Sequence, residues 1–248
     1  MINKLLDFYF KYSPMFTDRY EKYDAKFLFS KFVDDMYSNI AIVDNSTNLN
    51  KIDKEFISKN LESTYYSLNK LDNNFYAVYE DDFLLLENID TLYNKFKKFK
   101  NKNISLIEVV STDLENEYML INDKCYGEKS SDNPYSNLDN YGYCKTVLEY
   151  KKNESETKTL IYIIKYKNQN VGCINITIKN TLCYISGLAI LKEFRKSKVF
   201  LSMVNILEIL KNYNVNSVFC VTELDEYPDK LYKKLGFKSV GVVKGYKK

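Results

Sequence analysis

The chain has 248 residues, of which 45% are hydrophobic and 28% charged, and its formal net charge is +3. This balance is typical of a globular protein and excludes a disordered chain, and the length allows one large domain or two of ordinary size. Because the net charge is small, it gives no reason to expect nucleic acid or an acidic membrane surface as a partner.

The sequence contains no histidine. A Ser-His or Cys-His nucleophile pair is therefore excluded, and the commonest transition-metal ligand is missing, so we expect no metal site. Any proton transfer must use a carboxylate, tyrosine, lysine, cysteine or water. The 23 tyrosines accompany the excess of residues that A/T-rich codons encode, and we interpret them as compositional rather than as stacking platforms for bases.

The five cysteines form no Cys-x-x-Cys pair. They are Cys125, Cys144, Cys173, Cys183 and Cys220. Their odd number and their spacing favour buried free thiols in a reducing compartment over a disulfide framework or a zinc site. The sequence has no run of 18 or more apolar residues and no signal-peptide core at its start, so we expect a cytoplasmic protein that does not enter a membrane.

The first hundred residues are expected to form helices and a few short strands. The predicted elements are a helix at 24–37, a strand at 39–43, a helix at 51–71, a strand at 75–79 and a basic helix at 90–100. A linker fits best at residues 100–103. It divides the chain into a domain of residues 1–102 and a domain of residues 103–248.

The second half begins with a predicted strand at 104–110, and Thr112-x-x-Glu115 forms a capping box for a helix that continues to about Tyr126. Residues 127–145 are polar and rich in turn formers, so they are expected to be a loop with one short helix. Three strands separated by short turns follow, at 160–166, 171–179 and 182–191.

The last part of the chain alternates helix and strand. The predicted elements are a helix at about 196–213, a strand at 217–222, a helix at 225–235 and a strand at 239–246. Gly236 fits the left-handed position that ends a helix. The sequence therefore predicts an α/β protein whose second half has the order β-α-β-β-β-α-β-α-β.

One turn of the second half points to a chemistry. An apolar strand ends at Leu191, and the next helix opens with the basic run Arg195-Lys196-Ser197-Lys198. A helix that opens just after a strand directs unpaired backbone N–H groups at any anion that binds there. Apolar residues follow on one stripe of that helix, which indicates that one face packs on a sheet. They are Val199, Phe200, Met203, Val204, Leu207 and Leu210.

This segment resembles the acetyl-CoA-binding core of the GNAT family of acyltransferases. The family pattern Arg-x-x-Gly-x-Gly or Ala aligns with Arg195, Lys198 and Phe200, of which only the arginine matches. The family run Asn-x-x-Ala-x-x-x-Tyr-x-x-x-Gly-Phe aligns with Asp225, Pro228, Tyr232, Gly236 and Phe237. Val171–Ile174 resembles the strand that precedes the acetyl-CoA strand. The resemblance covers roughly residues 104–248.

The resemblance implies a GNAT-like mixed sheet flanked by helices in the second half. The first half then resembles a truncated, diverged GNAT unit, a smaller α/β domain of the kind found in some two-domain relatives. The implied activity is direct transfer of an acetyl group from acetyl-CoA, as co-substrate, to a primary amine of a small molecule or peptide. The thioester is already activated, so this chemistry needs no metal and no covalent intermediate.

The resemblance also implies where the co-substrate binds. The backbone groups of Leu188, Ala189 and Ile190 would pair with the amide-bearing pantetheine arm. The pyrophosphate would be bound by the N–H groups of the helix opening, the helix dipole and three basic side chains. The implied turn residues are Arg195, Lys196, Ser197, Lys198, Val199 and Phe200. Glycine is usual in such a turn because a Cβ hinders close approach of backbone to phosphate.

Two proton-transfer roles follow from the same alignment. Tyr232 aligns with the family tyrosine that protonates the departing thiolate, although a tyrosine packed on the sheet is an equally good interpretation. Glu223 and Asp225, at the end of a predicted strand, are the candidates for accepting the amine proton. Asp225 is better explained as the N-cap of the next helix, and we also assign it to the cofactor-binding segment.

Two rival interpretations remain open. The loss of both turn glycines favours a non-catalytic GNAT-like binding or regulatory module, in which the basic turn is only a solvated surface. The diverged first half favours a tandem protein that uses aminoacyl-tRNA or a longer acyl-CoA as donor. The sequence does not identify the acceptor or the oligomeric state.

Overall fold

The computed structural model describes residues 1–44, 46–126, 139–195, 199 and 202–248. The chain forms two compact units. Unit 1 comprises Met1–Leu85 together with Cys220–Lys248, and unit 2 comprises Leu86–Phe219. The sequence division into 1–102 and 103–248 stays a prediction, because the compact units group the end of the chain with its first half.

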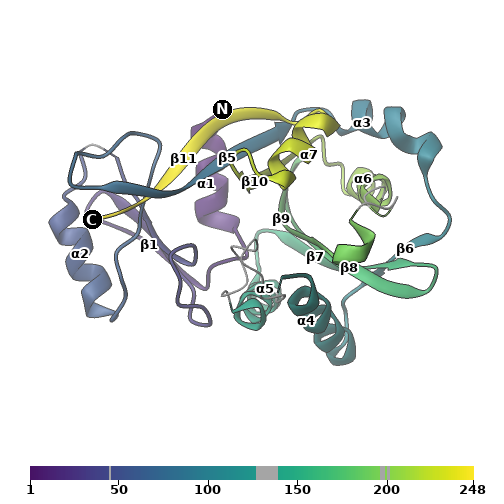
Figure 1. The fold of residues 1–248 in the computed structure, drawn as a ribbon, viewed down its shortest axis with the longest axis horizontal. Helices are drawn as coiled ribbons and strands as arrows, with labels where there is room; N and C mark the ends of the chain where they lie inside the picture. The colour runs from purple at the N-terminus through teal and green to yellow at the C-terminus, as the bar shows by residue number, and fades with distance from the viewer. Residues whose placement is uncertain (45, 127–138, 196–198, 200–201) are drawn as a thin grey trace. The chain divides into compact units, whose positions relative to one another are not determined.

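Unit 1 is a mixed sheet with helices packed on it (Figure 1). Its elements are α1 (Ile2–Tyr12), β1 (Asp18–Lys22), β2 (Ala25–Phe29), β3 (Asn39–Ile42), α2 (Leu49–Ser58), β4 (Tyr65–Ser67), β5 (Tyr76–Leu86), α7 (Tyr227–Leu235) and β11 (Lys238–Lys247). β1, β2 and β3 form an antiparallel meander, and β3 pairs in parallel with β4. The connection between these two parallel strands is α2, which makes a βαβ crossover.

The last strand of the chain is inserted into the sheet of unit 1. β5 follows β4 in sequence, yet the two are not neighbours, because β11 lies between them. β11 is antiparallel to both, and Figure 1 shows it running alongside β5. Gly245 is opposite Tyr66 of β4 on one side and Tyr79 of β5 on the other. Residues 238–247 therefore hold two parts of the first half together.

The helix predicted at 24–37 is wrong. Residues 18–29 form a β-hairpin instead, with Tyr23 and Asp24 at φ of 56° and 57° in its turn. Two successive left-handed residues match the twist of a two-residue hairpin, and neither is the glycine that usually marks one. The helix predicted at 51–71 ends at Ser58. The later residues Tyr65 and Tyr66 belong to the strand β4 instead, where both side chains are buried. The strand predicted at 39–43 is confirmed as β3.

Unit 2 contains an antiparallel meander, β6-β7-β8-β9, with helices around it. Its elements are α3 (Ile89–Phe96), a 3₁₀ turn (Lys97–Phe99), β6 (Ile104–Glu108), α4 (Thr112–Tyr126), α5 (Asn140–Asn153), β7 (Lys158–Tyr166), β8 (Gln169–Lys179), β9 (Leu182–Ile190), a second 3₁₀ turn (Lys192–Phe194), α6 (Ser202–Asn212) and the start of β10 (Ser217–Glu223). The three strands predicted between 160 and 191 are confirmed.

Two details of unit 2 differ from the predictions. The helix at 112–126 is present, but the capping residue is Ser111, whose Oγ accepts a hydrogen bond of 3.4 Å from the Leu114 N–H. Residues 127–138 lie outside the described part of the chain, and the predicted loop also contains the start of α5, a full helix. Asp139 caps α5 by accepting the Gly142 N–H at 2.8 Å.

Gly236, in unit 1, has the predicted left-handed conformation at the end of α7, with φ of 100°.

The two halves of the chain repeat one order of elements. β1-β2-β3-α2-β4 in the first half corresponds to β7-β8-β9-α6-β10 in the second, each a meander followed by a helix and one more strand. The predicted fold class is confirmed: an α/β protein with a GNAT-like mixed sheet flanked by helices and a smaller first half that resembles a truncated copy.

Candidate active site

β9 contains a bulge just before the predicted cofactor strand. Asn175 of β8 is opposite Gly187, and the next residue, Ile176, is opposite Ile185, so Ser186 is the extra residue in β9. A bulge bends its strand and increases the local twist, and bulges are common beside active sites. Before the bulge, Tyr184 is stacked on Phe219, with ring centroids 4.7 Å apart, which attaches β9 to the start of β10.

After the bulge, Leu188 and Ile190 direct their backbone groups away from β8. Leu191 donates its N–H to Val171 of β8 at 2.9 Å, so Leu191 and Ala189 occupy the hydrogen-bonded positions of this antiparallel pair. Backbone groups alternate along a strand, so those of Leu188 and Ile190 face the other edge. This is the arrangement that binding an amide-bearing arm requires.

Two side chains of unit 2 already bind carbonyls at this edge. The Tyr126 hydroxyl donates to the Leu188 carbonyl at 3.3 Å, and the Arg195 Nε donates to the Ile190 carbonyl at 2.9 Å. Arg195 Nη2 also donates to the Cys125 carbonyl, at 2.7 Å, in the last turn of α4. In this structure, then, the arginine of the predicted phosphate turn connects the end of β9 to the end of α4.

The rest of the predicted phosphate turn is largely outside the described residues. Lys196, Ser197, Lys198 and Phe200 are in this group, so their assignment stays a prediction. Val199 is described and is fully buried in an apolar cluster with Ile104, Ile164 and Val171. Its side chain is therefore part of the core of unit 2, and any contact of Val199 with a ligand must use its backbone.

Replacing Arg195 with methionine is expected to lower the free energy of unfolding by about 1 kcal/mol, because charge-assisted hydrogen bonds to two carbonyls are lost at a largely exposed site. Urea denaturation followed by circular dichroism measures this effect. Lys167→Met, which removes a positive charge from an exposed turn of the same unit, is the matched control and should change stability by less than about 0.5 kcal/mol. Equal stability of the Arg195 variant and the parent would contradict the bridging role.

The two predicted proton-transfer residues belong to unit 1. Tyr232 lies on α7 and is 5% exposed, with its ring edge-on to Phe237 at 5.1 Å. Glu223 ends β10 and is partly exposed. It lines a cavity of about 260 Å³. The cavity is lined by Ala77, Val78, Tyr79, Glu80, Glu223 and Leu224.

Asp225 does not cap α7, so that expectation is wrong. The N-cap residue is Glu226, whose side chain makes no capping hydrogen bond, and Pro228 lies in the first turn of the helix. Asp225 is exposed in the preceding turn with a left-handed φ of 62°. Its N–H donates to Asp229 at 3.2 Å, so Asp229 stabilises the turn from inside the helix.

A buried ionic network attaches α7 to the sheet of unit 1, and the sequence did not predict it. Asp229 and Asp82 of β5 are 0% and 1% exposed, and the ammonium of Lys233 lies 2.8 Å from the first and 2.9 Å from the second. Ser239 of β11 donates to Asp82 at 2.6 Å. Hydrogen bonds to both carboxylates raise the pKa of Lys233.

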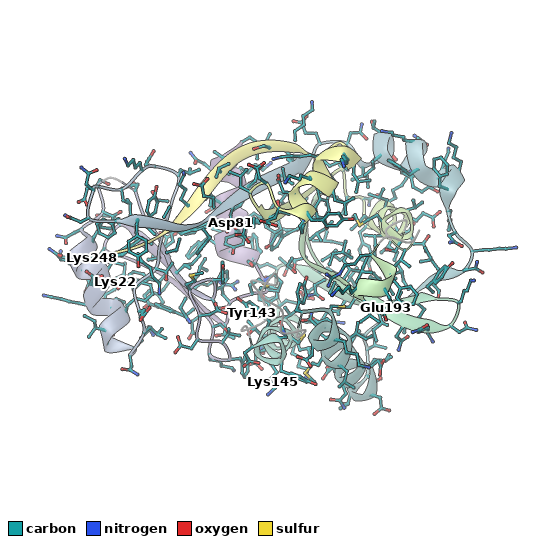
Figure 2. The ribbon with its side chains drawn as sticks, in the orientation of Figure 1. Lys22, Asp81, Tyr143, Lys145, Glu193 and Lys248 are labelled. Carbon is teal, nitrogen blue, oxygen red and sulfur yellow. The ribbon has the colours of Figure 1, made fainter. Side chains whose placement is uncertain are left out.

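The opposite face of β5 carries a second unpredicted group, Asp81 (Figure 2). The Tyr66 hydroxyl donates to its carboxylate at 2.8 Å. The pKa of Asp81 is raised to about 7, because burial and the negative charge of Glu223 raise it by more than the Tyr66 hydrogen bond lowers it. The run Glu80-Asp81-Asp82 was the available signal, because three consecutive acidic residues in a strand must place a carboxylate on each face.

The cysteines are buried and free, as predicted. Burial raises the pKa of the Cys125 and Cys144 thiols to about 12, so neither is a thiolate nucleophile near neutral pH. Within the described ranges, no three His, Cys, Asp or Glu side chains gather as a metal site would need. The helices in the same ranges include none that is long and apolar enough to cross a membrane.

Comparisons with known proteins agree with this fold. The sequence profile of the Acetyltransferase (GNAT) family matches residues 116–237. A comparison with curated protein sequences finds no significant match.

Three solved structures share the fold at low sequence identity. A conserved protein of unknown function from Staphylococcus epidermidis is 12% identical with a TM-score of 0.68, and the match covers 96% of each chain. A GCN5-related N-acetyltransferase from Kribbella flavida is 13% identical with a TM-score of 0.62, over 92% of this chain and 88% of that one. A tandem GNAT protein from the clavulanic acid biosynthesis pathway is 12% identical with a TM-score of 0.54, over 84% and 74%. The chain therefore carries a GNAT acetyltransferase domain at residues 116–237.

Proposed function

We propose that the protein is an N-acetyltransferase that moves an acetyl group from acetyl-CoA directly to a primary amine of a small molecule or peptide. The observation that carries the proposal is the match of the GNAT family to residues 116–237. It is supported by the bulge in β9, beyond which Leu188 and Ile190 direct backbone groups away from β8. We further propose a cytoplasmic location and no nucleic-acid partner.

The proposed roles are those that the family alignment implies. The edge of β9 pairs with the pantetheine arm, and the N–H groups and charges of residues 195–200 bind the pyrophosphate. Glu223 receives the proton that the ammonium of the acceptor loses. The amine nitrogen then attacks the thioester carbonyl, the C–S bond breaks, and Tyr232 gives its hydroxyl proton to the departing sulfur. The second proton, which the nitrogen loses as the amide forms, passes through water to the tyrosinate and restores the Tyr232 hydroxyl.

Calorimetry with acetyl-CoA tests the donor. Micromolar binding is expected, and Lys198→Glu should weaken it at least tenfold, because the substitution places a negative charge in the anion-binding turn. Lys102→Glu makes the same charge change at an exposed residue outside that turn and should leave the affinity within twofold. Failure to bind any acyl-CoA would overturn the proposal and favour a non-catalytic binding module, which the carbonyl contacts of Arg195 and the missing turn glycines also fit.

Steady-state kinetics with a panel of amines tests the acid. Tyr232→Phe should lower kcat by roughly 100-fold while leaving the dissociation constant of acetyl-CoA unchanged, since it removes one hydroxyl proton donor and keeps the ring that packs on Phe237. A kcat equal to that of the parent would show that Tyr232 is only a packed residue of α7.

A further inference from the structure

Asp81 lies on a face of β5 that is rich in tyrosine and separate from the ionic network of α7. Side chains alternate along a strand, so Tyr79, Asp81 and Phe83 share one face, while Glu80 and Asp82 share the other. Contacts confirm the division. Tyr66 binds Asp81 and packs near Tyr79, whereas Lys233 binds Asp82.

The Glu223 side chain lies on the same face of the sheet as Asp81. Thr222, its neighbour in β10, bonds to Asp229 of α7 at 3.4 Å, so Glu223 points to the side of the sheet away from α7. Burial and the negative charges of Glu223 and Asp81 raise the pKa of Tyr37 to about 12. β10 is the neighbour of β5 in the sheet, and Leu224 donates its N–H to the Glu80 carbonyl at 2.8 Å, so Glu223 and Asp81 are neighbours across these two strands.

The surroundings of Asp81 supply little positive charge. From β4, Tyr66 donates its hydroxyl, and from β10, Glu223 adds a negative charge. From β11, the opposite residue is Val243, and Lys244 directs its ammonium to Glu80, 2.5 Å away on the other face. Tyr9 of α1 packs on Tyr66, and Tyr37 packs on Tyr79. Because these neighbours on its own face are neutral or negative, the site favours the protonated, neutral form of the Asp81 carboxyl group.

We propose that Asp81 is a positioning residue for Glu223, and that it takes up the proton that Glu223 receives from the acceptor ammonium. This inference rests on the proposed function. Glu223 lines the 260 Å³ cavity together with Glu80. The Glu80 carboxylate is paired with the Lys244 ammonium at 2.5 Å, so we assign the amine to Glu223. The transferred proton moves from nitrogen to the Glu223 carboxylate and on to the Asp81 carboxylate, whose hydrogen bond from Tyr66 is kept throughout. Glu223 is then ionised again for the next acceptor.

The pKa of about 7 for Asp81 gives this transfer a measurable signature. Asp81 must be ionised before each turnover, so kcat/KM should rise with pH through about 7 and level off above it. Glu223 raises the pKa of Asp81, so in Glu223→Gln the Asp81 carboxyl should titrate at lower pH when the resting protein is titrated. Tyr66 lowers that pKa, so Tyr66→Phe should move the rise to higher pH.

The test combines pH–rate profiles with a titration of the resting protein. In Asp81→Asn the asparagine oxygen still accepts the Tyr66 hydroxyl, so the fold is expected to hold, while the rise near pH 7 should vanish and kcat should fall at least tenfold. Asp34→Asn, an exposed residue of the same unit, is the control. Carbon-13 NMR of the protein with labelled aspartate should show one carboxyl signal that titrates near pH 7. This signal should be absent only from Asp81→Asn, and its titration should shift in Glu223→Gln and in Tyr66→Phe in the directions given above.

The outcomes separate the two proposals. If acetyl-CoA binds and turns over but the pH profile of Asp81→Asn matches that of the parent, the role of Asp81 is overturned and the proposed function stands. An aspartate signal that titrates only near pH 4 has the same consequence. If no acyl-CoA binds at all, the proposed function fails first, and the proton-acceptor role fails with it.

Discussion

Replacing Lys233 with methionine is expected to lower the free energy of unfolding by about 3 kcal/mol. Methionine keeps most of the length and apolar volume of the lysine stem but removes the cation that Asp82 and Asp229 share. Both carboxylates are buried, and leaving buried charges without a partner is among the costliest single changes in a protein. The figure is taken from the lower end of the usual range because the Lys233 side chain is itself 35% exposed.

The pH dependence of this variant identifies the cause. Without the cation, two negative charges are left in a buried site, and acid neutralises carboxylates. The loss of stability caused by the missing cation therefore depends on pH. The difference between variant and parent should therefore shrink as the pH falls towards 4, in urea denaturation measured at several pH values.

Lys230→Met is the matched control for this experiment, because Lys230 is exposed on the same helix. It should change stability by less than about 0.5 kcal/mol at every pH. If the two methionine variants were equally stable at pH 7, the network between α7 and β5 would carry none of the stability assigned to it.

Replacing Gly245 with valine is expected to lower the free energy of unfolding by about 3 kcal/mol. Gly245 lies opposite Tyr79, and a Cβ at this position would come within 2.3 Å of the Tyr79 ring. That ring cannot move aside easily, because it is 6% exposed and packs on Tyr37 and Tyr66. Valine favours strands, so a loss of stability must come from crowding.

A double-mutant cycle isolates this contact. Gly245→Val should cost much less in a Tyr79→Ala background, because the clashing ring is then absent, and the coupling between the two sites should exceed 1 kcal/mol. Lys238→Val, an exposed change in the same strand, should be close to neutral. Additive effects of Gly245→Val and Tyr79→Ala would refute the crowding explanation.

The second half of the fold was predictable because its signals are local. Turns at Lys167-Asn168 and Asn180 separate long apolar runs, and the structure has hairpins there with left-handed residues. The strand β2 in the first half was not, because Phe27, Leu28 and Phe29 are all buried, and a strand buried on both faces has no alternation to distinguish it from a helix. The Tyr23-Asp24 turn adopts a glycine-like conformation without a glycine.

The candidate site was predictable only where family motifs exist. Tyr232 and the β9 edge follow from alignment, whereas Asp81 and the Asp82–Lys233–Asp229 network depend on pairing between residues far apart in the chain. Lys233 lies 151 positions from Asp82 in sequence, and only the placement of α7 against β5 brings them together. Neither alternation nor spacing along one segment contains that information.

The insertion of β11 between β4 and β5 also orders events during synthesis. A nascent chain that ends at residue 102 already contains both of those strands, but the strand that separates them is made only after residue 237. Until it emerges from the ribosome, β4 and β5 either remain with unpaired edges or pair with each other, and the second arrangement must open before the native sheet can close. The sheet of unit 1 therefore stays incomplete until residues 238–247 have been made, and a ribosome stalled before residue 238 should present it as a substrate for chaperones.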